Sequence, residues 1–313
     1  MATILITHGV PADGFAPLEG HEILIPAPLC AYSRDELLAL IPRADAVVAG
    51  GALDGDVIRA GTKLKVIANY GAGYDKVDVA AAAACGVPVT NIPAAVAETT
   101  AELAIALMMA VSRRIGEMNL RMRSEAPENL FGMGREMGGN LFGKTLGIVG
   151  MGRIGGCVAR IARALGMTVL GMNRHGIDTT LAEQVSMDEL LRRSDVVSLH
   201  CPLTAETRGL IDEAAIAQMK PGAILINTAR GPVVDEEALA RAVAEGRLAG
   251  AGIDVYPDEP HVPACLLEQP RIVLTPHVGS NTADARRLMA QMCSAQILDA
   301  LAGKRPKNIV NGL

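Results

Sequence analysis

Short apolar runs alternate with helical patterns along almost the whole of the 313-residue chain. Such runs, bounded by Gly, Pro, Asn or Asp, predict strands. The expected strands are residues 3–7, 22–25, 45–49, 65–69, 87–90, 145–150, 168–172, 195–199, 223–228, 250–254 and 271–275. Alternation of strands with helices brings the strands together in parallel and covers both faces of each sheet. The sequence therefore predicts an α/β fold.

The helices between these strands carry start and stop signals. Ser33 and Glu36 form a capping box for an expected helix at 33–41. Gly166 and Gly246 follow helical patterns, and glycine at such a position commonly ends a helix. Four further helices are expected to begin near Arg153, Met187, Asp212 and Asp235. Two long helices are expected at residues 98–114 and 282–302.

The length of the chain exceeds what one ordinary hydrophobic core holds, which predicts two domains. The expected boundary is the long helix at 98–114, because a Gly- and Met-rich stretch at 129–143 follows it and predicts an exposed crossover or arm. We expect the last helix to return to the first domain. The prediction is thus two doubly wound parallel-sheet domains, with residues 99–282 inserted in a discontinuous domain made of 1–98 plus 283–313.

Composition excludes several classes of protein. The net charge is −5 with Trp absent and only 4 Tyr and 3 Phe, which argues against a nucleic-acid surface. The 6 cysteines are scattered without a CxxC pair, so we expect reduced, mostly buried thiols and no metal site. The N-terminus lacks the features of a signal peptide, and the longest apolar helical run, 103–111, is shorter than the ~20 residues that span a bilayer. We therefore expect a soluble, cytoplasmic protein without a membrane partner.

The segment GIVGMGRIGG, residues 147–156, follows an expected strand and opens an expected helix. In that context Gly150-x-Gly152-x-x-Gly155 predicts a dinucleotide-binding turn, with Arg153 and Ile154 at the start of the helix. The first glycine permits the tight turn, the second lets the backbone approach a pyrophosphate, and the third lets helix and strand pack closely. The alternative is a glycine-rich turn without a ligand.

The end of the next strand carries no carboxylate. Asn173 falls where such a unit usually has the Asp or Glu that binds the ribose 2′-hydroxyl, and Arg174 and His175 follow it. An arginine there can form charge-assisted hydrogen bonds to a 2′-phosphate, and the histidine adds a possible donor. We therefore predict NADP rather than NAD as the preferred cofactor, with NAD as the weaker alternative. The competing interpretation is an exposed arginine without a ligand.

Three further segments, LINTARGPVVD (225–235), GIDVYPDEP (252–260) and LTPHVGS (274–280), follow strands at the edge where an open parallel sheet binds ligands. They supply Arg230 to pair with a carboxylate, His277 as a proton donor and Glu259 to hold the imidazole ring and stabilise its charged form. Taken singly, Arg230 is more simply part of a surface ion pair, Glu259 a solvated acid and His277 a residue that caps a loop. Together they predict a catalytic triad. The histidines without such a setting are His8, His21, His200 and His261, although His200-Cys201-Pro202 is expected to line the cofactor cleft.

At this point the chain resembles the D-isomer-specific 2-hydroxyacid dehydrogenases, over essentially all of its length. The motifs that carry the resemblance are NYGAGYDKVD (69–78), TTAELAIALMMAVSRR (99–114), GKTLGIVGMGRIG (143–155), HCPLTAETRGLI (200–211), INTARGPVVDEEAL (226–239), GAGIDVYPDEP (250–260) and LTPHVGSNT (274–282). Within the family it is most similar to the NADP-dependent glyoxylate/hydroxypyruvate reductase branch. The resemblance implies a Rossmann dinucleotide-binding domain inserted in a flavodoxin-like substrate domain, and a homodimer formed through the dinucleotide-binding domains.

The resemblance also implies roles for individual residues. The backbone of Gly71, Ala72 and Gly73 would bind the substrate carboxylate together with Arg230, and Asp254 would face the nicotinamide carboxamide. The other residues expected at the cofactor are Thr100, His200, Cys201, Pro202, Thr207, Thr228, Ala229, Arg230, His277 and Gly279.

The function predicted from these features is reduction of a small 2-oxoacid, such as glyoxylate or hydroxypyruvate, to the D-2-hydroxyacid by hydride transfer from NADPH. Two alternatives stay open: a cofactor-sensing, partner-binding protein of the same fold, and a dehydrogenase for an inorganic anion such as phosphite. The loop Gly50-Gly51-Ala52-Leu53 on the substrate side has no charged side chain, and only Phe131 and Phe142 represent the aromatic residues in or beside the 129–143 stretch. The preferred R group of the substrate is therefore open.

Overall fold

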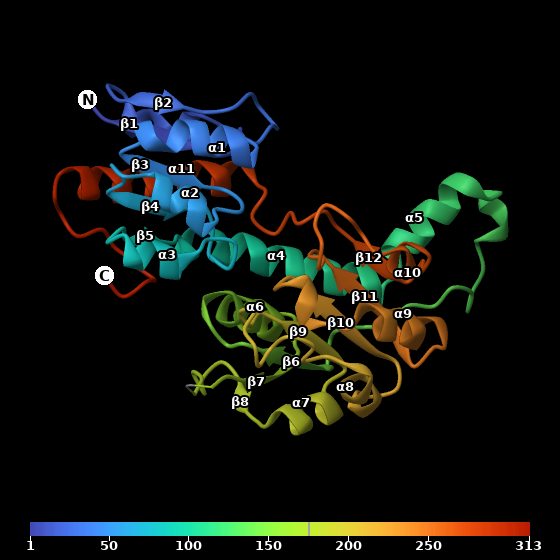
Figure 1. Cartoon of the computed structure of the whole chain (residues 1–313). Coiled ribbons are helices and arrows are strands. Elements are labelled where there is room, and N and C mark those ends of the chain that lie inside the picture. The colour runs from blue at the N-terminus through green and yellow to red at the C-terminus, as the bar shows by residue number, and fades with distance from the viewer. Residues whose placement is uncertain (175) are drawn as a thin grey trace. The chain divides into compact units, whose positions relative to one another are not determined.

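The computed structural model describes residues 1–174 and 176–313, with the side chain of Pro127 outside the description. The chain forms two compact units: unit 1 contains Met1–Val96 and Ser280–Leu313, and unit 2 contains Ala97–Gly279. Each unit is built on a parallel sheet with helices on both faces (Figure 1). The predicted fold class, two doubly wound parallel-sheet domains, is confirmed.

The sheet of unit 1 has the strand order β2-β1-β3-β4-β5. Its strands are β1 (Thr3–Ile6), β2 (Glu22–Leu24), β3 (Ala46–Ala49), β4 (Val66–Asn69) and β5 (Val89–Thr90). This is the flavodoxin-like order, and the connection reverses direction between β1 and β3. Ligands of open α/β sheets bind outside the carboxyl ends of the strands at such a reversal.

Side chains of these strands alternate between two hydrophobic cores because successive residues of a strand point to opposite faces. Ile4 and Ile6 pack with the final helix, α11 (Ala283–Leu301), whereas Leu5 packs on the other face. The remaining helices of unit 1 are the 3-10 turns η1 (Asp13–Leu18) and η2 (Ile41–Arg43), and α1 (Arg34–Leu40), α2 (Gly55–Ala60) and α3 (Val79–Ala84). The capping box predicted at Ser33 and Glu36 is present at the start of α1.

The sheet of unit 2 has the order β12-β11-β10-β9-β6-β7-β8, all parallel. Its strands are β6 (Thr145–Val149), β7 (Thr168–Met172), β8 (Glu183–Gln184), β9 (Val196–Leu199), β10 (Ala223–Asn227), β11 (Leu248–Ile253) and β12 (Ile272–Leu274). Counted from β6, this is the Rossmann order with one further strand, and the direction reverses between β6 and β9. The sequence did not predict β8, because this short strand is exposed and has no apolar run.

Two layers of helices cover this sheet. One core contains residues of α4 (Pro93–Ser112) and α6 (Arg153–Ala164). The core on the opposite face contains residues of α7 (Met187–Arg193), α8 (Glu213–Gln218), α9 (Glu236–Ala244) and α10 (Ala264–Leu267). Gly166 and Gly246 end helices with φ of +75° and +74°, as glycine at a helix C-terminus permits.

Helix α4 begins at Pro93, earlier than the sequence predicted, because proline is favourable in the first turn of a helix. It is longer than the apolar run at 103–111, and among the described residues it is long and apolar enough to cross a membrane, with mean hydropathy 1.6. However, 56% of the tested window is buried, and Ala101, Ala104 and Met108 lie in the core of unit 2. A mostly buried helix of this kind is typical of a globular core, so its composition is weak support for a membrane span.

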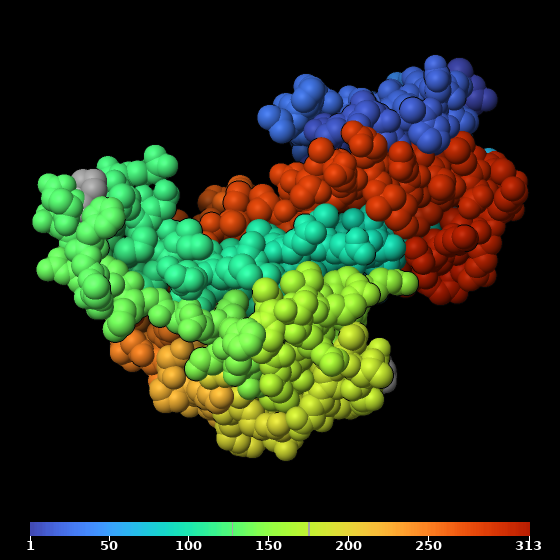
Figure 2. All heavy atoms as spheres, turned by 180° about the vertical axis from the view of Figure 1, so that it is seen from behind, coloured from blue at the N-terminus to red at the C-terminus, as the bar shows by residue number. Residues whose placement is uncertain are grey.

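The segment after α4 contains a helix that the sequence did not predict, α5 (Ile115–Ser124), followed by the short turn η3 (Pro127–Asn129). In Figure 2 the green spheres of this region form a lobe at one side of unit 2. One expectation about the cysteines was wrong: only Cys201 and Cys293 are buried, whereas Cys30 and Cys85 are exposed.

Candidate functional site

The glycine-rich turn joins β6 to α6 at the point where the strand order of unit 2 reverses. Gly150 has φ of +96°, which a residue with a side chain adopts only with strain. A Cβ at this position would lie 2.7 Å from the backbone nitrogen of Cys201. The turn therefore packs directly on the loop that follows β9, and the two loops meet at the ligand-binding edge of the sheet.

The space around the turn fits a pyrophosphate. No heavy atom of the described chain lies within 4 Å of the place where a Cβ of Gly152 would stand, whereas a Cβ of Gly155 would collide with the carbonyl oxygen of Gly150. Gly152 precedes the first turn of α6, where Arg153 and Ile154 follow it. The amide groups at a helix start lack intrahelical acceptors and carry a partial positive charge. Open space beside these amides is what a dinucleotide phosphate needs.

The residues at the end of β7 have different surroundings. The side-chain amide of Asn173 donates to the carbonyl oxygen of Gly176 at 3.1 Å, so it closes the turn. Arg174 is exposed. A hydrogen bond from Thr204, with a smaller contribution from the charge of Arg174, lowers the pKa of Glu206. The charge of Arg174 therefore acts on a carboxylate of the loop after β9. His175 lies outside the described residues.

The ring of His200 lies between two hydroxyl groups at the ends of β9 and β10. Its Nε2 is 2.8 Å from the Oγ of Ser198, and its Nδ1 is 3.4 Å from the Oγ1 of Thr228. Burial lowers the pKa of His200 to about 4, so the ring is neutral near pH 7. The ring is thus a neutral group at the ends of these two strands rather than an acid.

The loop after β9 is held by its own hydrogen bonds. The Oγ1 of Thr207 donates to the carbonyl oxygen of Pro202 at 2.7 Å and accepts from the amide of Thr204 at 2.8 Å. The loop after β10 is closed in a similar way. The side chain of Asn227 accepts from the amide of Ala229 and donates to the carbonyl oxygen of Arg230, at 3.0 Å in each case. The sequence did not single out Asn227, although a polar residue at a strand end is a usable signal.

His277 and Glu259 form a pair. The Nδ1 of His277 lies 2.9 Å from Oε1 and 3.0 Å from Oε2 of Glu259, which leaves Nε2 on the outer side of the ring. The histidine side chain is 44% exposed and the glutamate only 21%, so the carboxylate is the more enclosed partner. His277 has φ of +52°, which is strained for a residue with a side chain, and its amide donates to the carbonyl oxygen of Asp254 at 2.8 Å.

Asp254 holds the loop that carries this histidine. Its Oδ1 accepts from the hydroxyl of Thr275 at 2.6 Å and from the amide of Val278 at 2.8 Å, and its Oδ2 accepts from the amide of Gly279 at 2.9 Å. A Cβ on Gly279 would also lie 3.3 Å from the methyl group of Thr100. Asp254, Gly279 and Thr100 are therefore neighbours, and the carboxylate fixes the strained loop.

Arg230 follows β10, on the loop next to the one that carries Glu259. A Cβ on Gly231 would overlap the backbone of Tyr256, so the two loops touch. The amide of Tyr256 donates to the Oε1 of Glu259 at 3.3 Å. The loops that present all three predicted catalytic residues thus lie at the carboxyl ends of β10, β11 and β12.

In unit 1 the loop after β4 has its carbonyl oxygens turned toward two asparagines. The side-chain amide of Asn69 donates to Gly71 at 3.0 Å and to Gly73 at 2.9 Å, and that of Asn91 donates to Ala72 at 2.8 Å. The amide of Gly71 donates to the Asn69 carbonyl. The described hydrogen bonds give the amides of Ala72 and Gly73 no acceptor, so two of the three predicted residues can donate to an anion. The sequence did not single out these two asparagines, which stand at the ends of β4 and β5.

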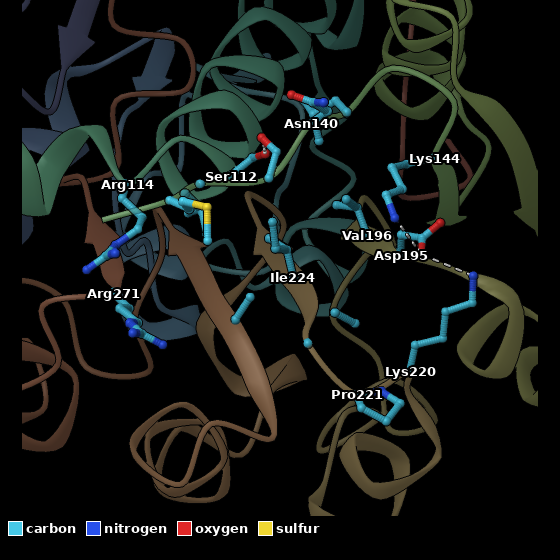
Figure 3. Close-up of a pocket in the computed structure, with 18 residues that line it drawn as sticks. Ser112, Arg114, Asn140, Lys144, Asp195, Val196, Lys220, Pro221, Ile224 and Arg271 are labelled. Atoms are coloured by element: carbon cyan, nitrogen blue, oxygen red, sulfur yellow. Dashed lines mark hydrogen bonds and ion pairs between the residues drawn. The ribbon is translucent and has the colours of Figure 1, made fainter. Parts of the chain in front are cut away.

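A cavity of about 290 Å³ opens at the opposite edge of the unit 2 sheet, before β6 and β9 (Figure 3). Three of its charged groups, Lys144, Asp195 and Lys220, lie close to one another. The Oδ1 of Asp195 lies 3.2 Å from the Nζ of Lys220 and 4.0 Å from that of Lys144. None of the predicted site residues is among its lining residues. Within residues 1–174 and 176–313, no group of three or more His, Cys, Asp or Glu is placed to hold a metal ion.

Known proteins match the chain over nearly its whole length. The model of the family "D-isomer specific 2-hydroxyacid dehydrogenase, NAD binding domain" matches residues 105–279. The glyoxylate reductase of Thermococcus litoralis is 40% identical to this chain, and the alignment covers 98% of the chain and 96% of that protein.

Solved structures show the same fold over the full length. A glyoxylate reductase from Paecilomyes thermophila has a TM-score of 0.88 at 34% identity, covering 99% of this chain and 98% of that one. An NADPH-dependent glyoxylate/hydroxypyruvate reductase from Sinorhizobium meliloti, solved with NADP and malonate, has a TM-score of 0.86 at 28% identity, covering 99% and 96%. The chain therefore belongs to the D-isomer-specific 2-hydroxyacid dehydrogenase family and is an NAD(P)-dependent oxidoreductase.

Proposed function

We propose that the chain reduces a small 2-oxoacid, with glyoxylate and hydroxypyruvate as first candidates, to the D-2-hydroxyacid with NADPH. The observation that carries the proposal is the 2.9 Å contact between the His277 ring and the Glu259 carboxylate. This pair stands at the same sheet edge as a glycine-rich turn that fits a dinucleotide. A carboxylate that holds one ring nitrogen fixes the orientation of the imidazole, which is the arrangement expected of a positioned general acid.

In the proposed reaction the cofactor, when bound, supplies the hydride that reduces the keto carbon. His277 holds a proton on Nε2 and donates it to the carbonyl oxygen, while Glu259 accepts from Nδ1 and stabilises the charged ring. Arg230 pairs with the substrate carboxylate through a charge-assisted hydrogen bond. In unit 1 the amides of Ala72 and Gly73 are the proposed donors to a carboxylate group, because Asn69 and Asn91 hold the carbonyl oxygens of the same loop. Asp254 keeps the loop of His277 in its strained conformation.

The preference for NADPH rests on Arg174 and on the lack of a carboxylate at Asn173. A neighbouring family member of known structure is described as NADPH-dependent, which supports the same choice. The charge of Arg174 also acts on Glu206, so this carboxylate would compete with a phosphate for the guanidinium.

Replacing Arg174 by alanine is expected to lower the preference for NADPH over NADH by about 10-fold or more, because a charge-assisted hydrogen bond contributes about 1.5–3 kcal/mol. The measurement is kcat/KM for both cofactors at saturating oxoacid. Arg192→Ala, which removes another exposed arginine of unit 2, is the control and should leave the ratio unchanged. An unchanged ratio in Arg174→Ala would refute the assignment.

A homodimer is part of the same proposal. Large apolar side chains are exposed along the segment 115–142, namely Ile115, Leu120, Met122, Phe131, Met133, Met137 and Phe142. Several large apolar side chains exposed on one segment are typical of a protein–protein contact. We expect light scattering to give twice the chain mass of 32.6 kDa at micromolar concentration. A monomer at that concentration would contradict this part of the proposal.

The function is tested by assaying glyoxylate, hydroxypyruvate and pyruvate with NADPH and NADH, and phosphite with the oxidised forms of both cofactors. We expect turnover of the 2-oxoacids with NADPH preferred, and a D-configured product from hydroxypyruvate and pyruvate. Turnover of phosphite alone would favour the inorganic-anion alternative. Cofactor binding without turnover of any compound would favour the partner-binding alternative.

A further inference from the structure

His8 occupies a position in unit 1 that its sequence context did not reveal. Thr7 and His8 directly follow β1, and Gly50 and Gly51 directly follow β3, the next strand in the sheet (Figure 1). The strand order of unit 1 reverses between these two strands, which is where open α/β sheets bind ligands. The ring of His8 therefore lies at the ligand-binding edge of the sheet. In the strand order, β3 stands between β1, which His8 follows, and β4.

The imidazole of His8 occupies the space that side chains at Gly50 and Gly51 in the β3 loop would need. A Cβ on Gly50 would lie 3.0 Å from the Nδ1 of His8, and a Cβ on Gly51 would lie 2.5 Å from its Cε1 and 2.9 Å from its Nε2. For both glycines the three nearest heavy atoms belong to the His8 side chain, and for Gly51 all three are ring atoms. The ring thus covers the two glycines, with Nε2 at the Gly51 end, and any side chain on these residues would displace it.

The hydrogen bonds of Thr7 define which ring nitrogen carries the proton. The hydroxyl oxygen of Thr7 accepts from the amide of Gly50 at 2.9 Å and lies 2.9 Å from the Nδ1 of His8. Thr7 is only 2% exposed, so its hydroxyl proton needs a protein acceptor, and Nδ1 is the acceptor within reach. The ring is then protonated on Nε2. Burial, followed by the charge of Lys76, lowers the pKa of His8, which keeps the ring neutral near pH 7.

Nε2–H has no hydrogen-bond partner among the described residues, although it stands at a functional edge. The neighbouring β4 loop provides the free amides of Ala72 and Gly73 that we have proposed for the substrate carboxylate. On the β5 side of that loop Asn91 is already used to hold the Ala72 carbonyl. A group that extends from the bound acid toward β3 meets the two bare glycines and the imidazole above them.

We infer that His8 is a specificity-determining residue, whose Nε2–H donates a hydrogen bond to an oxygen on the third carbon of the 2-oxoacid. This inference rests on the proposed function and narrows its substrate class to 3-hydroxylated 2-oxoacids such as hydroxypyruvate. A neutral donor suits a hydroxyl oxygen, and glyoxylate, which has no third carbon, gains nothing from it. The two glycines are required because they leave room for the ring.

The test compares kcat/KM for hydroxypyruvate and glyoxylate in His8→Phe, which keeps a flat ring and removes both nitrogens. The loss of one neutral hydrogen bond is expected to lower the value for hydroxypyruvate about five- to tenfold. The value for glyoxylate should stay within about twofold, which also shows that the variant is folded. His21→Phe is the matched control: His21 stands just before β2, at the opposite edge of the same sheet, and should change neither value.

His8→Gln provides a second variant, because its amide nitrogen can take the place of Nε2 and should restore part of the preference for hydroxypyruvate. The inference would be overturned if kcat/KM fell equally for both substrates in both variants, or fell for neither. The proposed function would then still stand, because it is tested by the activity of the wild type. A wild-type protein that reduces neither oxoacid would remove the proposed function, and the inference with it.

Discussion

Replacing His277 by asparagine is expected to lower kcat by about 10²- to 10⁴-fold, the usual contribution of a positioned general acid. Asparagine is chosen because it tolerates the φ of +52° at this position better than most residues, so the loop held by Asp254 should keep its conformation. The substitution then removes the proton on Nε2 and the contact with Glu259 while leaving the backbone intact. Measured cofactor affinity should therefore stay close to the wild-type value.

The chain offers a matched control for this experiment. His261 also lies near a carboxylate, with its Nδ1 3.5 Å from the Oδ2 of Asp258, but both side chains are more than four-fifths exposed, at 81% and 89%. His261→Asn should leave kcat unchanged, because a solvated pair contributes little. If His277→Asn retained more than about one-tenth of the wild-type kcat, the role of the imidazole as general acid would be wrong.

The second large effect is expected in stability, at Glu236. This residue begins α9 and is only 7% exposed, and neither of its carboxyl oxygens has a hydrogen-bond partner among the described residues. The titratable groups near it are Tyr256 and Cys265, which give it no positive charge. Burial raises the pKa of Glu236 from 4.5 to about 7. The field at a helix N-terminus favours the ionised form, but the lost hydration outweighs it.

A carboxyl group whose pKa is raised by folding binds its proton more tightly in the folded chain. The folded state is therefore penalised when the group ionises: the stability is fully present below the unfolded pKa near 4.5 and is lost as the pH rises through about 7. The loss amounts to about 3 kcal/mol between pH 5 and pH 9.

Glu236→Met, which fills a similar volume without charge, should remove this pH dependence. The measurement is the free energy of unfolding in urea, as the difference between variant and wild type at pH 5 and at pH 9. We expect the free energy of unfolding of the variant, relative to that of the wild type, to be about 3 kcal/mol higher at pH 9 than at pH 5. Glu237→Met changes the exposed neighbour and should show no such gain. A difference that is independent of pH in Glu236→Met would contradict the buried, unpaired carboxyl.

Sequence periodicity located nearly all of the long or buried strands. For example, the run at 168–172 coincides with β7. It failed for β8 and for α5, since a short exposed strand and a helix without buried residues have no apolar pattern to detect. The glycine spacing likewise indicated the turn at Gly150, because backbone conformations of this kind require glycine wherever they occur.

The sequence did not predict the contacts that the site residues make. Asp254 was expected to face the nicotinamide, and the structure shows both of its oxygens holding the loop of His277. His8 was set aside as a histidine without a setting, although it lies over Gly50 and Gly51. Each of these contacts joins residues that are distant along the chain, so no local pattern reports it.

The sequence by itself therefore determined the α/β alternation, the dinucleotide turn and the set of residues able to carry chemistry, because these depend on local conformation and on residue type. Only the tertiary structure decided that His277 pairs with Glu259, that the ring of His8 lies over two glycines, and that Glu236 is buried without a hydrogen-bond partner among the described residues. The physical reason is that strand order brings separate loops to one edge of a sheet, and burial is a property of the packed whole.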